Sequence, residues 1–231
     1  AIKMEVERST PPKIGFLEAV REICDKEKII LIFDECTSGF RETFGGIHLK
    51  YKVNPDICMF GKALGNGYAI TSLIGKGNIM KKSKESFISS TFWSERIGYT
   101  AGCKTLEVME KTKSWEYVTK LGKKIKKEWT RLSKKYELPL QINGIDALPN
   151  FFIKSQNSLE YKTLISQEML KKKFLSTNSV YVSVAHNKKI MEDYIKILDK
   201  IFIIIKECEE GRDIKKLLNG PVCKASFKRL N

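Results

Sequence analysis

The sequence has few of the residues that build metal centres and membrane spans. Only two histidines, His48 and His186, occur in 231 residues, and no two of the six cysteines have the C-x-x-C spacing typical of a zinc site. No apolar run approaches the ~20 residues that a transmembrane helix needs. We therefore expect no metal centre and no membrane partner, and we expect both histidines to be structural or to lie on the surface.

Arginine is also scarce for a chain this basic. The net charge is +15 and the pI is about 9.5, but only 7 of the 42 basic residues are arginine, which leaves 42 − 7 = 35 lysines. A nucleic-acid interface would interleave arginine and aromatic side chains on one face. The lysines instead follow helix surfaces, as in KLGKKIKKEW. This pattern predicts solvated faces with weak attraction to polyanions, and no specific nucleic-acid partner. A nucleic-acid-binding protein remains an alternative that depends on charge alone.

The cysteines indicate a reducing compartment. Several of the six lie inside apolar runs, where a thiol behaves as a small hydrophobic side chain. Reduced thiols in a cytoplasmic protein fit this pattern better than a disulfide framework does. The balance of 42% hydrophobic and 30% charged residues is ordinary for a globular protein, and the length suits one large domain or two modest ones.

The first part of the chain alternates helices with short apolar strands. Apolar residues recur at helical spacing over 16–24, residues 29–33 form an unbroken apolar run, and 57–60 and 69–74 have the character of further strands. Ser94 is expected to cap a helix that ends near residue 109. An apolar strand without polar alternation is typical of a parallel sheet covered on both faces. The fold class predicted is therefore α/β with a mainly parallel sheet.

The pattern changes at about residue 111. Apolar residues then recur every three or four positions over 115–136, which predicts a long amphipathic helix with a lysine-rich outer face. Further along, we expect short strands around 140–145 and 150–154, a helix at 159–174, a strand around 179–184 and a helix at 188–209. These elements indicate a second, smaller α/β domain. We therefore place the domains at 1–110 and 111–231.

Two of the predicted strands end on charges of opposite sign. In LIFDECTSGF an apolar run ends at Asp34 and Glu35, and in PDICMFGKALGNGY a second run ends at Gly61 and Lys62. Ligands of open parallel sheets bind beyond the carboxyl ends of the strands. Asp34 and Lys62 therefore either flank a ligand site or form an incidental ion pair, and a buried ion pair contributes little net stability. The surrounding glycines favour a ligand that approaches the backbone closely.

Three segments carry a resemblance to a known family. LIFDECTSGFR, NPDICMFGKALGNGYAITSLIG and SSTFWSERIGYTAGCKTLEVM resemble the class III aminotransferases, fold-type I enzymes that depend on pyridoxal 5'-phosphate (PLP), and in particular their glutamate-1-semialdehyde aminomutase-like branch. The match runs from about residue 1 to 110, and the tail DIKKLLNGPVCKASFKRLN is also similar. The resemblance implies that 1–110 is the C-terminal part of a large PLP-binding domain and that 111–231 is the small C-terminal domain.

The resemblance also gives several residues a role. It implies that Lys62 forms the Schiff base with PLP and later carries a proton between the substrate Cα and the cofactor C4′, and that Asp34 keeps the pyridinium nitrogen protonated. Cys36 stands where the family usually has valine and would pack under the ring. Thr91 resembles the threonine that reaches the cofactor phosphate of the neighbouring subunit, although a plain strand-end threonine is the alternative. Glu35 either orients its neighbours or is only a strand-end charge.

The function that follows is PLP-dependent transfer of an amino group from a small-molecule donor to a carbonyl acceptor, in a homodimer with shared active sites. Aminotransferase and aminomutase are not separated, and a catalytically silent scaffold that keeps the fold is the alternative. The family's phosphate-binding turn and ring-stacking aromatic lie N-terminal to the matched region, and neither is found in 1–231. Because the chain also lacks an initiator Met and opens on a strand-like AIKMEVE, we expect a fragment of a longer enzyme that alone binds PLP weakly and is inactive.

Overall fold

The computed structural model describes residues 1–89, 91 and 93–224. The chain forms two compact units, the first spanning residues 1–119 and the second beginning at residue 120. The division falls inside one long helix, whereas the change in sequence pattern comes near residue 110. The boundary of the family's two domains at residue 110 therefore stays a prediction, and each unit is described by itself.

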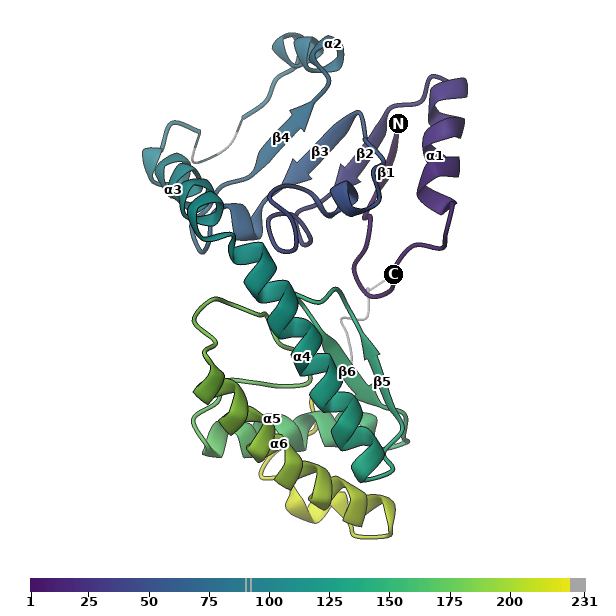
Figure 1. Ribbon diagram of the computed structural model, residues 1–231, viewed down its shortest axis with the longest axis vertical. Helices are drawn as coiled ribbons and strands as arrows, with labels where there is room; N and C mark the ends of the chain where they lie inside the picture. The colour runs from purple at the N-terminus through teal and green to yellow at the C-terminus, as the bar shows by residue number, and fades with distance from the viewer. Residues whose placement is uncertain (90, 92, 225–231) are drawn as a thin grey trace. The chain divides into compact units, whose positions relative to one another are not determined.

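A four-stranded sheet organises the first unit (Figure 1). The strand order is β1-β2-β3-β4, with β1, β2 and β3 parallel and β4 antiparallel to β3. The register pairs Asp34 with Met59, so the carboxyl ends of β2 and β3 lie side by side. This arrangement agrees with the predicted mainly parallel sheet. The strands are β1 (Ile2–Met4), β2 (Leu31–Asp34), β3 (Ile57–Phe60) and β4 (Ser72–Gly75).

Helix α1 (Phe16–Lys26) is tied to the amino ends of the central strands. The Arg21 guanidinium donates to Asp56 Oδ2 over 3.0 Å, and the same oxygen accepts from the Leu31 amide over 2.8 Å. Leu17 and Cys24 form the buried face of the helix, as the periodicity predicts. The shorter helices of this unit are η1 (Ile47–Lys50), η2 (Lys62–Leu64), α2 (Gly77–Met80) and η3 (Lys81–Glu85).

Two predicted boundaries around helix α3 (Arg96–Thr112) are wrong. Glu95 rather than Ser94 occupies the position that precedes the helix, and no side chain caps it. The strand expected over 69–74 begins only at Ser72. The reason is close packing, since a Cβ on Gly98 would lie 2.5 Å from the Ala69 carbonyl oxygen. Residues 69–71 thus lie under the start of α3 instead of pairing with β3.

The second unit packs three long helices and a hairpin around one aromatic core. The Trp129 indole nitrogen donates to the Tyr194 hydroxyl over 3.1 Å, and its ring meets Phe151 edge-on at 4.7 Å. Phe151 lies 5.9 Å from Phe202, which joins the hairpin to the last long helix. The elements are the greater part of α4 (Ser114–Lys135), together with β5 (Leu140–Asn143), β6 (Asn150–Ile153), α5 (Ser158–Lys171), α6 (Lys188–Glu209) and η4 (Ile214–Leu217).

The strand expected around 179–184 does not form. Ser179 makes an isolated bridge to Asn150, where the Phe151 amide donates to the Asn178 carbonyl over 2.9 Å. The amides of Val180 and Val182 also bond across, to the carbonyls of residues 149 and 147, each over 3.0 Å. The facing segment is a turn with Gly144 in the left-handed region (φ 86°), so it offers no strand to pair with. A β-branched run therefore stays extended without becoming part of a ladder.

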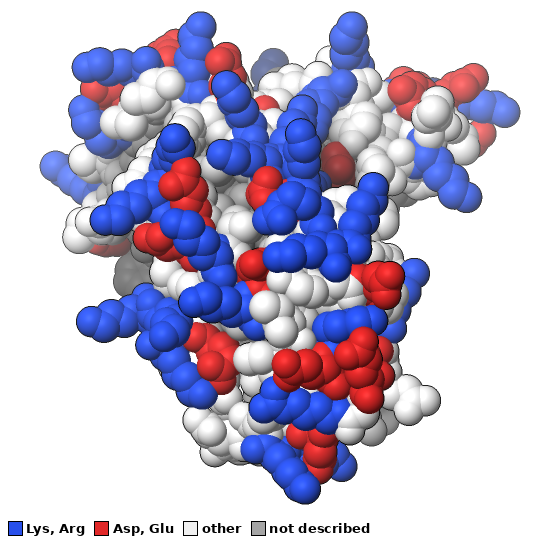
Figure 2. All heavy atoms as spheres, turned by 60° about the horizontal axis from the view of Figure 1, so that its bottom comes forward, with Lys and Arg blue, Asp and Glu red and all other residues white. Residues whose placement is uncertain are grey.

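Figure 2 shows many Lys and Arg side chains interspersed with Asp and Glu side chains on the visible face. All six cysteines lie in the described part of the chain, and each is a free thiol. Among the described helices, none is long and apolar enough to cross a membrane.

Candidate active site

Asp34 closes strand β2 and holds an ionised carboxylate. Its Oδ1 accepts the Cys36 amide over 3.1 Å, and its Oδ2 lies 2.9 Å from Lys3 Nζ on the neighbouring strand β1. The hydrogen bond from Lys3 lowers the pKa of Asp34 below its usual value, and the same contact raises the pKa of Lys3. The carboxylate therefore already binds a cation at the carboxyl edge of the sheet.

Lys62 lies at the end of the adjacent strand β3. Its backbone takes the left-handed conformation (φ 45°), which costs a non-glycine residue about 1–2 kcal/mol. Its carbonyl accepts from the Asn66 amide over 3.1 Å, which holds the turn in place. The Nζ donates to Thr37 Oγ1 over 2.6 Å. The incidental Asp34–Lys62 ion pair is thus not the arrangement found, because each side chain has a different partner.

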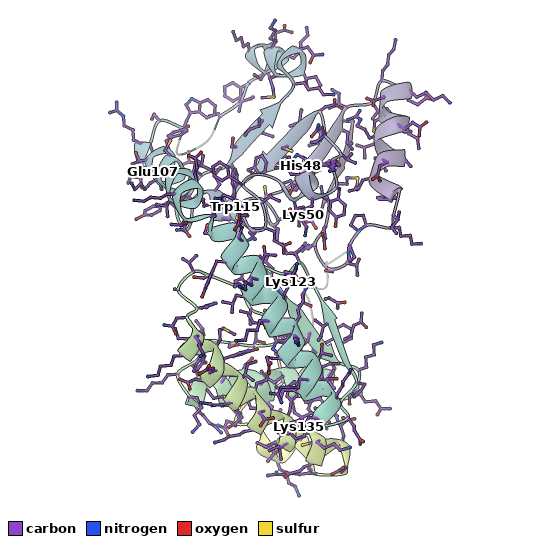
Figure 3. The ribbon with its side chains drawn as sticks, viewed as in Figure 1. His48, Lys50, Glu107, Trp115, Lys123 and Lys135 are labelled. Carbon is purple, nitrogen blue, oxygen red and sulfur yellow. The ribbon has the colours of Figure 1, made fainter. Side chains whose placement is uncertain are left out.

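Glu35, the residue after Asp34, anchors the turn that follows strand β2. Its side chain is fully buried and accepts four hydrogen bonds: from the Ser38 hydroxyl (2.5 Å), the Ile47 amide (2.9 Å), the His48 amide (2.9 Å) and His48 Nδ1 (2.9 Å). Figure 3 shows His48 beside strands β2 and β3. Burial raises the pKa of Glu35, but the hydrogen bonds outweigh it and leave the pKa below its usual value. An ionised carboxylate only accepts, so Nδ1 carries the ring proton.

Cys36 lies between the two strand ends as a neutral thiol. A Cβ on Gly61 would lie 3.7 Å from Cys36 Sγ, which places the sulfur against the residue before Lys62. Burial, followed by the hydrogen bond with Asp34, raises the pKa of the Cys36 thiol. A half-buried neutral thiol is a packing group rather than a nucleophile.

Thr91 is exposed in a turn, and its neighbours 90 and 92 lie outside the described residues. The structure does not bring it to Asp34, Cys36 or Lys62 in the described contacts of one chain. Its predicted role toward a neighbouring subunit stays a prediction.

A pocket of ≈ 390 Å³ opens beside Lys62. Its walls come from the chain after η2 and from the start of α3, and they combine aromatic rings with one carboxylate. A larger pocket of ≈ 510 Å³ lies in the second unit and contains none of the predicted site residues. The side chains around the first pocket include Tyr68, Thr71, Trp93, Glu95 and Tyr99.

Sequence reasoning missed Thr37 and Ser38, whereas His48 is a buried structural residue, in line with the expectation for the histidines. The two missed residues each act through a contact with a residue far along the chain or in a turn, such as the 25-residue separation between Thr37 and Lys62. Periodicity carries no signal for such contacts. The T-S pair directly after Asp34 and Glu35 was the one visible hint, because hydroxyl side chains commonly bond within turns.

Comparison with known proteins identifies the family. A family model described as "Aminotransferase class-III" matches residues 9–212, which is well over half of the chain. The chain belongs to the class-III aminotransferases. The resemblance seen in the sequence is thereby confirmed.

Two curated relatives show how this chain compares with class-III enzymes. It is 38% identical over 154 residues to a 3-aminobutyryl-CoA aminotransferase of Cloacimonas acidaminovorans, covering 66% of this chain and 37% of that protein. It is 30% identical over 204 residues to a glutamate-1-semialdehyde 2,1-aminomutase of Saccharolobus islandicus, covering 82% of this chain and 48% of that protein. The chain thus spans about half, or less, of the length of these class-III relatives.

Solved structures show the same fold. The FumI protein of Sphingopyxis sp. MTA144, solved in its PLP internal aldimine form, superimposes with a TM-score of 0.82 at 19% identity, over 94% of this chain and 54% of that one. An S-selective transaminase from Arthrobacter sp. gives a TM-score of 0.75 at 20% identity, over 90% of this chain and 52% of that one. The predicted fold class, an α/β fold of the fold-type I PLP-dependent transferases, is confirmed.

Proposed function

We propose that this class-III aminotransferase chain carries the lysine and the carboxylate of a PLP-dependent site for amino-group transfer. The observation that carries the proposal is the placement of Lys62 and Asp34 at the carboxyl ends of adjacent parallel strands. The substrates are a small-molecule amino donor and a carbonyl acceptor. Intermolecular transfer and internal migration of the amino group share the same half-reaction, so both lie within the proposal.

The residues present fit the cofactor. Asp34 already binds an ammonium group through Oδ2 at 2.9 Å, and a protonated ring nitrogen makes the same demand on a carboxylate. Lys3, which supplies that ammonium, has a side chain that is 55% exposed and is free to swing aside. The neutral Cys36 thiol offers a small apolar surface next to both strand ends. When bound, PLP supplies the electron sink for bond cleavage at the substrate Cα.

Each side chain then has a chemical task. Lys62 would hold the cofactor through its Nζ amine until a substrate amine takes its place. The Lys62 amine would then be the group that takes up and returns the proton at the substrate Cα. Asp34 holds the proton on the ring nitrogen throughout. In the homodimer that we propose, Thr91 donates its hydroxyl to the phosphate bound by the partner subunit.

The residues assigned to the cofactor provide few hydrogen-bond donors for its phosphate. A phosphate of about two negative charges is usually neutralised by backbone donors at a helix N-terminus. The residues assigned here provide one hydroxyl, and that hydroxyl serves a neighbouring subunit. The chain also spans only 37% and 48% of the relatives that it matches. We therefore propose that the 231 residues alone bind PLP weakly and show no transaminase activity.

A PLP titration of the 231-residue chain tests this proposal, together with size-exclusion chromatography and an amino-donor assay. We expect weak, saturable binding that Asp34→Asn weakens further, because the asparagine oxygen can still accept a hydrogen bond but carries no charge to pair with a protonated ring nitrogen. Tight stoichiometric binding with turnover would contradict the weak-binding part. Binding that Asp34→Asn leaves unchanged would contradict the role of Asp34. A silent scaffold predicts no saturable binding at all.

A further inference from the structure

We propose that Thr37 is a positioning residue for Lys62, and that its hydroxyl holds the lysine Nζ at the β2 side of the site. The inference rests on the proposed function, because it assigns a task toward the group that reacts with the cofactor. The central observation is the 2.6 Å hydrogen bond from Lys62 Nζ to Thr37 Oγ1, which joins residues 25 positions apart.

Thr37 is carried on a rigid turn. Its carbonyl accepts from the Arg41 guanidinium over 2.7 Å, and the Gly39 amide bonds to the Glu35 carbonyl over the same distance. The side chains of the turn divide between two sides: Glu35 and Ser38 are buried and bonded to each other, whereas Thr37 is only half-buried and bonds to Lys62. A buried carboxylate thus fixes the backbone from which the Thr37 hydroxyl extends.

Lys62 needs such a partner. Its backbone conformation is set by the left-handed turn, but four carbon atoms separate Cα from the exposed Nζ. A lysine side chain without a partner populates many rotamers, and ordering it has an entropic cost. A short hydrogen bond to the Thr37 hydroxyl selects one of these rotamers. Thr37 therefore places Nζ over the turn that carries Asp34 and Cys36, where we propose that the cofactor ring lies.

A purely structural role for the hydroxyl fits less well. The hydrogen bonds that hold the turn use the Thr37 carbonyl and the Glu35 carboxylate, not Thr37 Oγ1. In the described contacts, Thr37 Oγ1 accepts the hydrogen bond from Lys62 Nζ. Loss of the hydroxyl should therefore free the lysine without unfolding the turn.

The test uses the 231-residue chain, PLP as the probe, and borohydride to reduce and trap the adduct. Peptide mass spectrometry gives the initial rate of labelling at Lys62 and, as an internal reference, at the other lysines. The variants are Thr37→Val, which keeps the shape, and Thr37→Ser, which keeps the hydroxyl. Thr130→Val is the matched control, because its hydroxyl bonds to the Lys126 carbonyl on the exposed face of α4.

We expect Thr37→Val to slow labelling of Lys62 about tenfold, the scale of one lost hydrogen bond, because the amine is no longer held in position. Thr37→Ser should stay within about twofold of the wild type on the same scale, and Thr130→Val should change nothing. The reference lysines should be labelled equally in every variant. Equal Lys62 rates in the wild type and Thr37→Val would overturn the inference. So would an equal loss in Thr37→Val and Thr37→Ser, since that would mark a structural defect.

A second measurement needs no cofactor, and so separates this inference from the proposed function. Reductive methylation with ¹³C introduces a methyl probe at each lysine, and Lys62→Arg identifies the Lys62 signal. We expect the Lys62 probe to be more ordered in the wild type and Thr37→Ser than in Thr37→Val. Equal mobility in all three would overturn the positioning role. An ordered Lys62 that PLP does not label would contradict the proposed function instead.

Discussion

Lys3 Nζ lies 2.9 Å from Asp34 Oδ2, so a lysine of strand β1 pairs with the carboxylate that ends strand β2. The register places Lys3 opposite Ile32, two residues before Asp34, and the long side chain reaches the carboxyl edge of the sheet. A protonated ring nitrogen would compete for the same oxygen in the proposed site. In the proposed site, Lys3 would therefore compete with the cofactor for Asp34.

Replacing Lys3 by methionine should release Asp34. The hydrogen bond from Lys3 is the first cause of the lowered Asp34 pKa, so in Lys3→Met that pKa should rise toward the ordinary value of 3.8. A carboxyl ¹³C NMR titration measures this directly, and PLP labelling of Lys62 should increase in parallel. An Asp34 titration identical in both proteins would show that Lys3 does not hold the carboxylate in solution.

Glu35→Gln should destabilise the first unit by about 2–4 kcal/mol. The ionised carboxylate accepts four hydrogen bonds in a fully buried position, and an amide cannot accept from all of these donors. Urea unfolding at neutral pH measures the difference. Glu107→Gln serves as the control, because that side chain is exposed and pairs with Lys104 on the helix surface.

The contribution of Glu35 should also depend on pH. Its folded pKa is lowered below the ordinary 4.5, so the stability that it contributes is present above about 4.5 and is lost as the pH falls through the lowered value. The difference in unfolding free energy between the wild type and Glu35→Gln should thus shrink on acidification. A difference that stays constant from pH 7 to pH 3 would contradict an ionised Glu35.

Gly122→Ala should destabilise the second unit by about 3 kcal/mol, the upper range for overpacking. A Cβ at this position of α4 would lie 1.7 Å from the Asp146 carbonyl oxygen, so helix and loop must separate. Gly77→Ala is the control, because nothing lies within 4 Å of the added methyl group. Thermal unfolding followed by circular dichroism compares them, and equal midpoints would show that α4 does not approach the loop this closely.

The elements that the sequence predicted well are those with strong periodicity or unbroken apolar runs. The helix expected over 115–136 is α4, Ser114–Lys135, and the one expected at 188–209 is α6, Lys188–Glu209. Strand β2 ends at Asp34, and strand β3 ends two residues before Lys62. Each charge therefore marks the end of an apolar run. Burial of one face gives a helix a periodic apolar pattern, and burial of both faces gives a strand a continuous apolar run. These elements can therefore be predicted from the local sequence.

The misses have a tertiary cause. The run 179–184 has strand composition, but its neighbour is a turn, and a ladder needs two strands. Residues 69–71 do not pair with the sheet, because Gly98 of helix α3 packs closely against the Ala69 carbonyl. The same holds at the site: the sequence identified Lys62 and Asp34, but their partners Thr37 and Lys3 became visible only once the strands were placed side by side.

The most direct test of the central claim is to locate the PLP adduct among the 35 lysines of this chain. The chain is incubated with PLP at rising concentration, reduced with borohydride and mapped by peptide mass spectrometry. Lys62→Arg removes the proposed group, and Lys52→Arg is the matched control, because Lys52 is also exposed and also left-handed (φ 58°). The account predicts saturable labelling at Lys62 that Lys62→Arg abolishes and Lys52→Arg leaves intact. Labelling spread over the lysines according to exposure alone, with no preference for Lys62, would contradict it.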